Sequence, residues 1–138
     1  MPELADTSAW VWSRRAPQLR GDFDDRVVAL EILTCEMVKL ELLTEARNGN
    51  EFDRRREQLD ALPQRSMGQA EWLRALDVYG WLAQQGGAHQ RSVKHADLLI
   101  AAAAERAEVP VLHYDEDFDR IAAVTGQPTR WIAPRGSL

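Results

Sequence analysis

The 138-residue sequence is poor in cysteine, in lysine and in long apolar runs. The single cysteine, Cys35, excludes an intrachain disulfide, so a reducing compartment suits the chain, and a small apolar core residue is its ordinary role. The longest apolar run, Leu98 to Ala104, is far shorter than the roughly 20 residues that a membrane-spanning helix needs. The N-terminus also lacks the basic start and apolar stretch of a signal peptide. We therefore expect a cytoplasmic protein with no membrane partner.

An excess of positive charge is also absent. The formal net charge is −5, with 22 acidic residues against 17 Lys and Arg, which at first argues against a nucleic-acid partner. Five of these acids stand in places where a solvated carboxylate is not expected: Asp6, Glu41, Asp97, Asp115 and Asp117. Without these five residues, 17 acidic residues remain, which equals the number of Lys and Arg. The net charge of −5 therefore corresponds to the five carboxylates of one possible acidic site.

Short apolar strands alternate with helices along the whole chain, which predicts a parallel sheet with helices on both faces. The carboxyl ends of parallel strands form the usual ligand site of such folds. For the first and third helices, Thr7 or Ser8 and then Thr34 are the expected N-caps. The pattern predicts strands at 3–6, 32–33, 110–114 and 129–132, and helices at 9–15, 19–30, 34–47, 52–61, 69–85, 94–107 and 118–124.

The suspect carboxylates follow predicted strands or lie among residues that favour burial. Asp6 and Asp115 stand at the carboxyl ends of strands, Asp97 opens an alanine-rich helix, and Glu41 interrupts an apolar helix face. Unpaired ionised carboxylates are costly in apolar surroundings, by several kcal/mol each. If the fold brings them together, their repulsion requires a divalent cation, and ligation by oxygen alone points to Mg²⁺ or Mn²⁺.

Each carboxylate also has a simpler interpretation. Asp6 can cap the first helix, and Asp97 can interact with the positive N-terminus of its own helix. Asp115 and Asp117 can belong to a solvated acidic turn. Glu41 is harder to explain in this way, because on a helical wheel it lies between Met37 and Val38.

Four segments resemble the four acidic motifs of PIN-domain ribonucleases, and in particular those of the VapC toxins of bacterial toxin–antitoxin pairs. They are Leu4-Ala-Asp-Thr-Ser-Ala-Trp, Val38-Lys-Leu-Glu-Leu-Leu, Ala96-Asp-Leu-Leu-Ile-Ala-Ala and Val111-Leu-His-Tyr-Asp-Glu-Asp-Phe. One motif alone is a weak signal, whereas four in the right order are a strong one. The resemblance covers essentially the whole chain and implies a single PIN-like domain over residues 1–138, with a three-layer α/β/α architecture and a short-stranded parallel sheet.

The resemblance also implies metal-dependent cleavage of RNA, in which clustered Mg²⁺ ions supply a nucleophilic water and neutralise charge on the phosphate. The implied catalytic residues are Asp6, Glu41, Asp97 and Asp115, with Asp6, Asp97, Asp115 and Asp117 as metal ligands. Glu41 either ligates or orients the water, and Thr7 and Ser8 hold the Asp6 carboxylate or a water. A further implication is a homodimer that a cognate VapB-like antitoxin inhibits, with an arginine reaching the carboxylates and a partner helix in a groove between the first helices.

Three points stay open at the level of sequence. The family has a small hydroxylic or amide residue where this chain has His113, which either packs at the strand end or binds phosphate. The candidates for RNA contacts are Arg14, Arg15, Arg91 and Lys94, with ordinary solvated charges as the alternative. Two other classes of protein are disfavoured. A phosphoryl-accepting receiver domain would need a lysine on a late strand, which this chain lacks. A PIN-like scaffold that only binds a partner would be expected to have lost a carboxylate.

Overall fold

The computed structural model describes residues 1–87 and 89–138. Four short strands form one sheet: β1 (Glu3–Ala5), β2 (Ile32–Leu33), β3 (Val111–His113) and β4 (Thr129–Trp131). Their order is β2-β1-β3-β4 and every pair is parallel, with Leu4 opposite both Leu33 and Val111. The predicted short-stranded parallel sheet is therefore confirmed.

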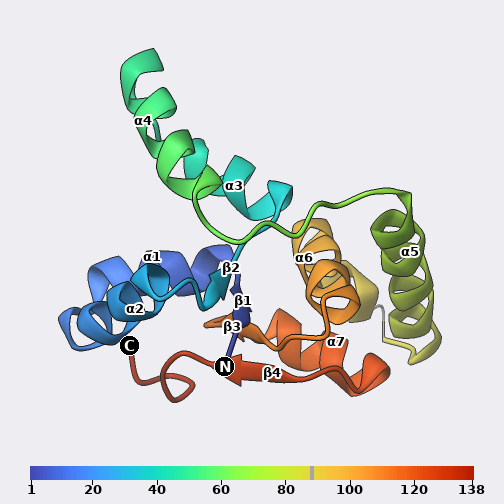
Figure 1. The fold of residues 1–138 in the computed structure, drawn as a ribbon. Helices are drawn as coiled ribbons and strands as arrows, with labels where there is room; N and C mark the ends of the chain where they lie inside the picture. The colour runs from blue at the N-terminus through green and yellow to red at the C-terminus, as the bar shows by residue number, and fades with distance from the viewer. Residues whose placement is uncertain (88) are drawn as a thin grey trace.

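Helices cover both faces of this sheet. In Figure 1, α1 (Thr7–Arg15) and α2 (Pro17–Val28) lie on one side, and α5 (Gln69–Gln84), α6 (His95–Arg106) and α7 (Asp117–Thr125) lie on the other. A 3₁₀ turn, η1 (His89–Ser92), precedes α6. The result is the three-layer α/β/α arrangement that the sequence predicted.

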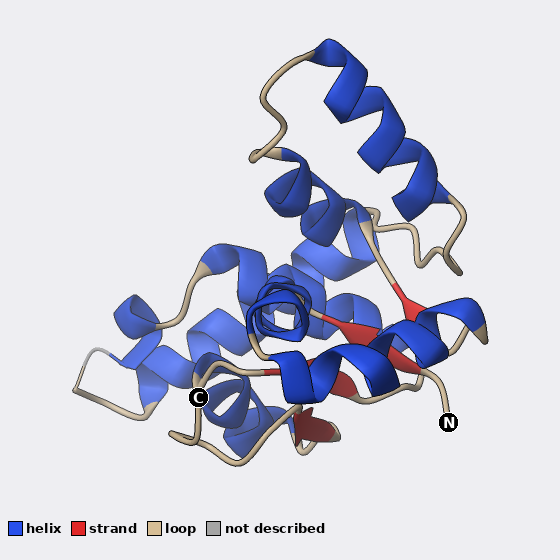
Figure 2. Cartoon of the chain, turned by 90° about the vertical axis from the view of Figure 1, so that its left-hand side faces the viewer, coloured by secondary structure: helices blue, strands red, loops and turns tan. Residues whose placement is uncertain are grey.

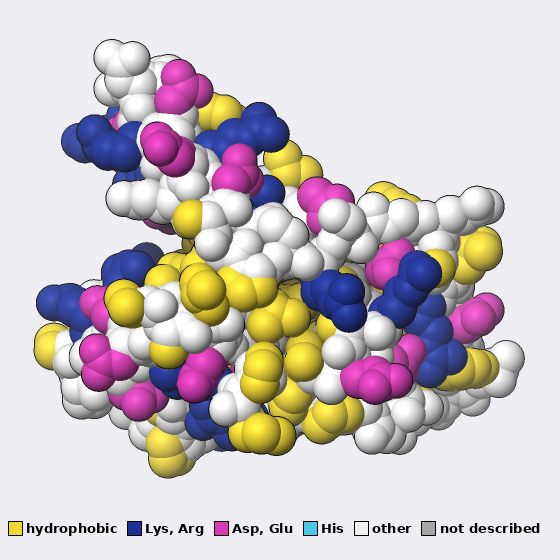
Figure 3. All heavy atoms as spheres, in the orientation of Figure 1, with side chains coloured by type: hydrophobic (Ala, Val, Ile, Leu, Met, Phe, Trp, Pro, Cys, Tyr) yellow, Lys and Arg dark blue, Asp and Glu magenta, His cyan; other side chains and the backbone are white. Residues whose placement is uncertain are grey.

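Two helices extend from one end of this body as an arm. They are α3 (Glu36–Leu43) and α4 (Gly49–Asp60), and α4 forms the outer part of the arm (Figures 1 and 2). A bridge between Thr34 and Gln64 joins the two chain segments where the arm meets the sheet. The arm leaves a notch between α4 and the α1–α2 layer, which is open to solvent in Figure 3.

The alanine-rich helix α6 is the centre of the core. Every residue from Asp97 to Ala104 is buried, because the helix packs between the sheet, α5 and α7. Small side chains let these neighbours approach closely on several sides, so a helix of moderate hydrophobicity can be buried along its length. Asp97, in the first turn of α6, is the one ionisable residue in this buried run.

Two predicted N-caps are wrong. Asp6 caps α1, since its Oδ1 accepts the backbone N–H of Ala9 at 2.9 Å, and Thr7 and Ser8 lie within the first turn. The simpler interpretation of Asp6 as a helix cap is therefore confirmed. Cys35, not Thr34, stands at the N-cap of α3 and makes no side-chain cap bond, because Thr34 is still part of the extended segment after β2. Pro17 does not only end the first helix: it opens α2, where its missing N–H costs nothing.

Candidate metal centre

The carboxyl ends of β1 and β3 bring two of the predicted motifs together. The strands pair directly, and the N–H of Asp6 continues the pairing by donating to Leu112 O at 3.0 Å. Ser8 joins the two motifs: its Oγ donates to Asp6 and accepts the backbone N–H of Tyr114 at 2.8 Å. Asp6 is therefore both a helix cap and part of the sheet edge at which Asp115 begins the next loop.

Three carboxylates converge at this edge. One oxygen from each of Asp97, Asp115 and Asp117 lies within 4.8 Å of the others. Asp97 comes from the first turn of α6, Asp115 from the turn between β3 and α7, and Asp117 from the first turn of α7. The N–H of Asp117 donates to Asp115 Oδ1. Asp97 and Asp117 are buried and Asp115 is half-buried. A solvated acidic turn, the simpler interpretation of this segment, does not describe these positions.

The cluster fits a hard divalent cation. Its donors are carboxylate oxygens alone, held by separate elements at a spacing that one ion can span. Burial raises the pKa of Asp97 to about 8, and the adjacent Asp117 adds to the effect. Burial likewise raises the pKa of Asp6 to about 7, with Asp115 contributing in the same direction. Carboxyl groups that resist ionisation because of burial and of one another are groups that a cation would stabilise in their charged form.

Asp6 and Glu41 stand outside the group of three that meets this spacing. Asp6 faces it closely enough for its charge to raise the pKa of Asp97, and for the charge of Asp115 to raise the pKa of Asp6. Glu41 is linked through Thr7, whose Oγ1 donates to Glu41 Oε1 at 2.6 Å. Both hydroxyls were predicted to hold Asp6, but each bonds a different acid: Ser8 donates to Asp6 and Thr7 donates to Glu41.

A lysine and an arginine neutralise part of the cluster. Lys94 Nζ lies 2.7 Å from Asp115, 3.0 Å from Asp117 and 3.4 Å from Asp97. Arg120 donates to the other oxygen of Asp117 at 3.0 Å and pairs with Glu116. The sequence analysis did not identify Arg120. Its spacing of three and four residues from Asp117 and Glu116 on one helix is the signal that would have found it.

His113 packs at the end of β3. It is fully buried against Phe118 and Trp131, and its Nδ1 accepts the backbone N–H of Asp115 at 3.2 Å. Among the described residues its Nε2 has no hydrogen-bond partner. Burial lowers the pKa of this imidazole, so the neutral ring is favoured. Of the two alternatives left open for His113, the geometry favours packing, together with support for the turn that begins at Asp115.

The predicted RNA-contact residues form two groups along the chain, Arg14 with Arg15 at the end of α1 and Arg91 with Lys94 before α6. Arg14 pairs with Asp24 and lies over the ring of Trp10, and Arg15 lies over Trp12. Arg91 is exposed in the turn before α6. Lys94 turns toward the carboxylates, so its direct neighbours are acids of the cluster.

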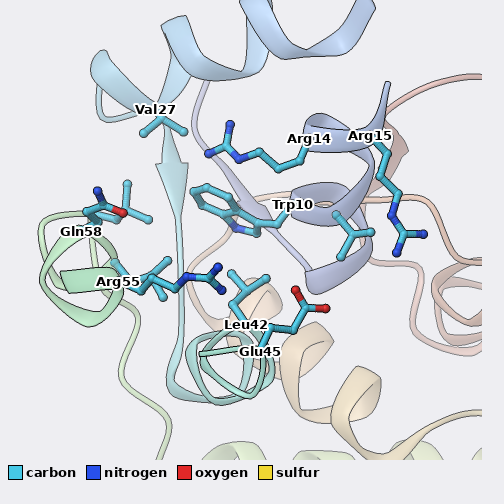
Figure 4. A pocket seen from close by; sticks show the side chains of 11 residues that line it. Trp10, Arg14, Arg15, Val27, Leu42, Glu45, Arg55 and Gln58 are labelled. Atoms are coloured by element: carbon cyan, nitrogen blue, oxygen red, sulfur yellow. The ribbon is translucent and has the colours of Figure 1, made fainter. Parts of the chain in front are cut away.

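A pocket of about 590 Å³ occupies the notch between the arm and the α1–α2 layer. Figure 4 shows Trp10 on its floor, Arg14 and Arg55 on opposite sides, and Leu42 and Glu45 from the arm. Trp10 is buried, and its Nε1 has no partner among the described residues. The groove was predicted between the first helices, whereas this pocket lies between α1 and the arm, and its wall is completed by residues of α3 and α4.

Comparisons with known proteins agree with this geometry. The family model described as PIN domain matches residues 4–124. Ribonuclease VapC18 of Mycobacterium tuberculosis is 45% identical over 133 residues, 96% of each chain. Ribonuclease VapC51 of the same organism is 38% identical over 135 residues, 98% of this chain and 96% of the relative.

Solved structures agree at the level of the fold. A DNA-bound VapBC complex from Salmonella typhimurium has a chain that superposes with a TM-score of 0.72 at 16% identity, over 96% of this chain and 100% of that one. VapBC-1 of nontypeable Haemophilus influenzae gives a TM-score of 0.72 at 14% identity, over 96% and 98%.

Proposed function

The chain belongs to the PIN-domain family, and from this premise we propose that it is a metal-dependent endoribonuclease, the toxin of a bacterial toxin–antitoxin pair, acting in the cytoplasm as one domain over residues 1–138. Relatives covering almost the whole chain are named as VapC ribonucleases, and structures with the same fold come from VapBC complexes. No helix in the described part of the chain is long and apolar enough to cross a membrane.

The observation that carries the proposal is the convergence of Asp97, Asp115 and Asp117 at the carboxyl edge of the sheet. These three, with Asp6 beside them, would hold Mg²⁺ or Mn²⁺ directly or through water. A bound ion of this kind supplies positive charge for the scissile phosphate and lowers the pKa of a water. Burial opposes the ionisation of Asp6 and Asp97 and raises the pKa of both, and a scaffold that only bound a partner would have no use for such acids.

The remaining polar residues of the site have positioning roles in this proposal. Ser8 fixes the Asp6 carboxylate, and Thr7 fixes Glu41, so both acids keep one orientation as substrate arrives. Glu41 is half-buried, which suits a base that orients a water. Arg120 holds Asp117 from the side away from Lys94.

For the RNA we propose a backbone path that passes exposed Arg91 beside the cluster and continues over Arg14 and Arg15. Arginine suits phosphate because its planar guanidinium donates two parallel hydrogen bonds. Lys94 would join this path only when its ammonium leaves the carboxylates.

For the antitoxin we propose the pocket between the arm and α1. It offers an apolar floor at Trp10 and Leu42 close to the motif that contains Asp6, so a helical segment lying there can extend an arginine toward the carboxylates. Charge-assisted hydrogen bonds from that arginine would satisfy the acids and inhibit the nuclease.

For the homodimer we propose the outer face of α5. Its residues Trp72, Leu73 and Leu76 are more than half exposed, and spacings of three and four place them on one side of the helix. A second copy of the chain would remove this apolar surface from water.

The chemistry of the products tests the nuclease proposal. Purified protein incubated with structured RNA should cut it with Mg²⁺ or Mn²⁺ present, lose cleavage in EDTA, and regain it when the metal is restored. A water nucleophile leaves 5′-phosphate and 3′-hydroxyl ends, which end-labelling and phosphatase sensitivity identify. A 2′,3′-cyclic phosphate, or cleavage that persists in EDTA, would overturn the proposal.

A further inference from the structure

Lys94 has an unusual position for a lysine. Its ammonium lies within hydrogen-bonding distance of one oxygen of each of the three carboxylates of the cluster. Its side chain is 61% exposed, whereas those of Asp97 and Asp117 are 7% and 4% exposed. The ammonium can therefore move into solvent, whereas the carboxylates of Asp97 and Asp117 stay buried.

The backbone of Lys94 is fixed independently of its side chain. Lys94 is the N-cap residue of α6, and its N–H donates to Asp117 Oδ2 at 3.1 Å. Arg120 holds the other oxygen of Asp117. Removing the ammonium therefore leaves Asp117 anchored on two sides, so a substitution at position 94 changes charge at the cluster without releasing its acids.

We propose that Lys94 is the resident counter-cation of the metal centre: its ammonium neutralises Asp115 and Asp117, beside Asp97, in the metal-free protein and has to leave this cluster before a divalent ion can bind. This inference rests on the proposed metal-dependent function. In this role Lys94 is a positioning residue that sets the metal affinity of the nuclease. Its ammonium competes with the metal ion for the carboxylates of the site.

The competition follows from geometry and charge. A divalent ion with oxygen ligands at about 2.0–2.2 Å needs the same carboxylate oxygens that Lys94 now contacts. An ammonium and a divalent cation in contact with one oxygen would repel each other at close range. The lysine is charged at neutral pH, since the ordinary pKa of a lysine side chain is about 10.4.

The proposal predicts opposite signs for two measurements on the same variant. Lys94→Met keeps the length of the side chain and removes its charge. The metal-free protein should then lose stability, because the Asp115 and Asp117 carboxylates lose their counter-cation. Its affinity for a divalent ion should rise, because no competitor has to be displaced. If Lys94 only assisted metal binding, Lys94→Met would lower both the stability and the metal affinity. If it were an ordinary surface residue, the substitution would change neither.

The experiment compares Lys94→Met with Lys39→Met, since Lys39 is the other lysine of the chain and pairs with Asp60 and Gln64 on the arm. Mn²⁺ binding is measured by electron paramagnetic resonance on chelator-treated protein, and melting temperature is measured with and without the ion. For Lys94→Met we expect a Kd for Mn²⁺ about tenfold lower than wild type, equivalent to about 1.4 kcal/mol, and a metal-free Tm lower by roughly 5 °C. For Lys39→Met we expect wild-type affinity.

Each outcome decides the matter. If wild-type protein binds Mn²⁺ and Lys94→Met binds it equally or more weakly, the role proposed for Lys94 is overturned. The nuclease proposal stays intact in that case. Wild-type protein that binds no Mn²⁺ would overturn the metal centre and this inference together. If Lys94→Met does not fold, Lys94→Gln removes the same charge while keeping a hydrogen-bond donor, and the same rise in affinity is required of it.

Discussion

The hydroxyl of Thr7 donates to Glu41 Oε1 at 2.6 Å, which links the residue after Asp6 to a helix 34 positions further along the chain. Through this bond the first turn of α1 fixes the acid of α3, on the arm, in relation to the sheet edge. Glu41 would otherwise be a flexible side chain on the inner part of the arm.

This link gives the first prediction. Thr7→Val removes the donor while keeping the shape, and should lower the rate of RNA cleavage roughly tenfold, the scale for losing a group that orients an active-site acid. Thr7→Ser should restore most of the rate. Thr44→Val is the matched control, since Thr44 donates to a backbone carbonyl at the exposed end of α3. Equal single-turnover rates for Thr7→Val and Thr44→Val would refute the positioning role.

The second prediction concerns pH and Asp6, whose pKa burial raises from 3.8 to about 7. Between these values the folded protein binds more protons than the unfolded chain, so this group lowers stability as pH rises from about 4 to 7. The full loss is on the order of 4 kcal/mol, because one pKa unit is about 1.4 kcal/mol. Asp6→Asn should therefore have a higher metal-free free energy of unfolding at pH 7.5 and a shallower pH dependence.

Urea denaturation in a chelator across this pH range measures the effect. The dependence should not disappear, because Asp97 has a raised pKa as well. Asp6→Ala is the comparison variant: it also removes the charge, but it loses the cap bond to Ala9 and should be less stable than Asp6→Asn by about 1 kcal/mol. Superimposable pH profiles for wild type and Asp6→Asn would contradict the prediction.

The third prediction concerns the pocket between the arm and α1. Val11→Arg places a long charged side chain in this pocket and should abolish binding of the antitoxin encoded beside the toxin, with RNA cleavage kept. Val28→Arg is the control, because Val28 is exposed at the end of α2 and does not line the pocket. Calorimetry of each purified variant with the antitoxin measures binding. Wild-type affinity in Val11→Arg would place the antitoxin elsewhere.

Much of the fold could be predicted because strand and helix periods are clear in this chain. Asp6, Asp97 and Asp115 could be proposed as neighbours because parallel strands end at one edge. The helix caps were harder to predict, because Asp6 could be assigned either to a metal site or to a cap. In the structure the Asp6 carboxylate caps α1 and also lies beside the other acids.

Long-range contacts were not predictable in the same way. The bond from Thr7 to Glu41 depends on how the arm meets the sheet, and the contacts of Lys94 depend on a side chain that turns back over its own helix end. A basic residue near acidic motifs suggested a contact with RNA. Only the folded structure shows that its ammonium lies among the acids themselves.

The most direct test of the central claim is single-turnover cleavage of one defined RNA in Mg²⁺ by Asp97→Asn and by Asp119→Asn. Asp97 is the buried acid of the cluster on α6, whereas Asp119 lies on α7 and accepts a hydrogen bond from Trp131 that asparagine can also accept. With both variants folded by circular dichroism, Asp97→Asn should cleave at least about 100-fold more slowly than wild type, the scale for losing one electrostatic contact in a transition state. Asp119→Asn should cleave within about twofold of wild type. Undiminished cleavage by folded Asp97→Asn would contradict the assignment of this cluster as the metal centre of a ribonuclease.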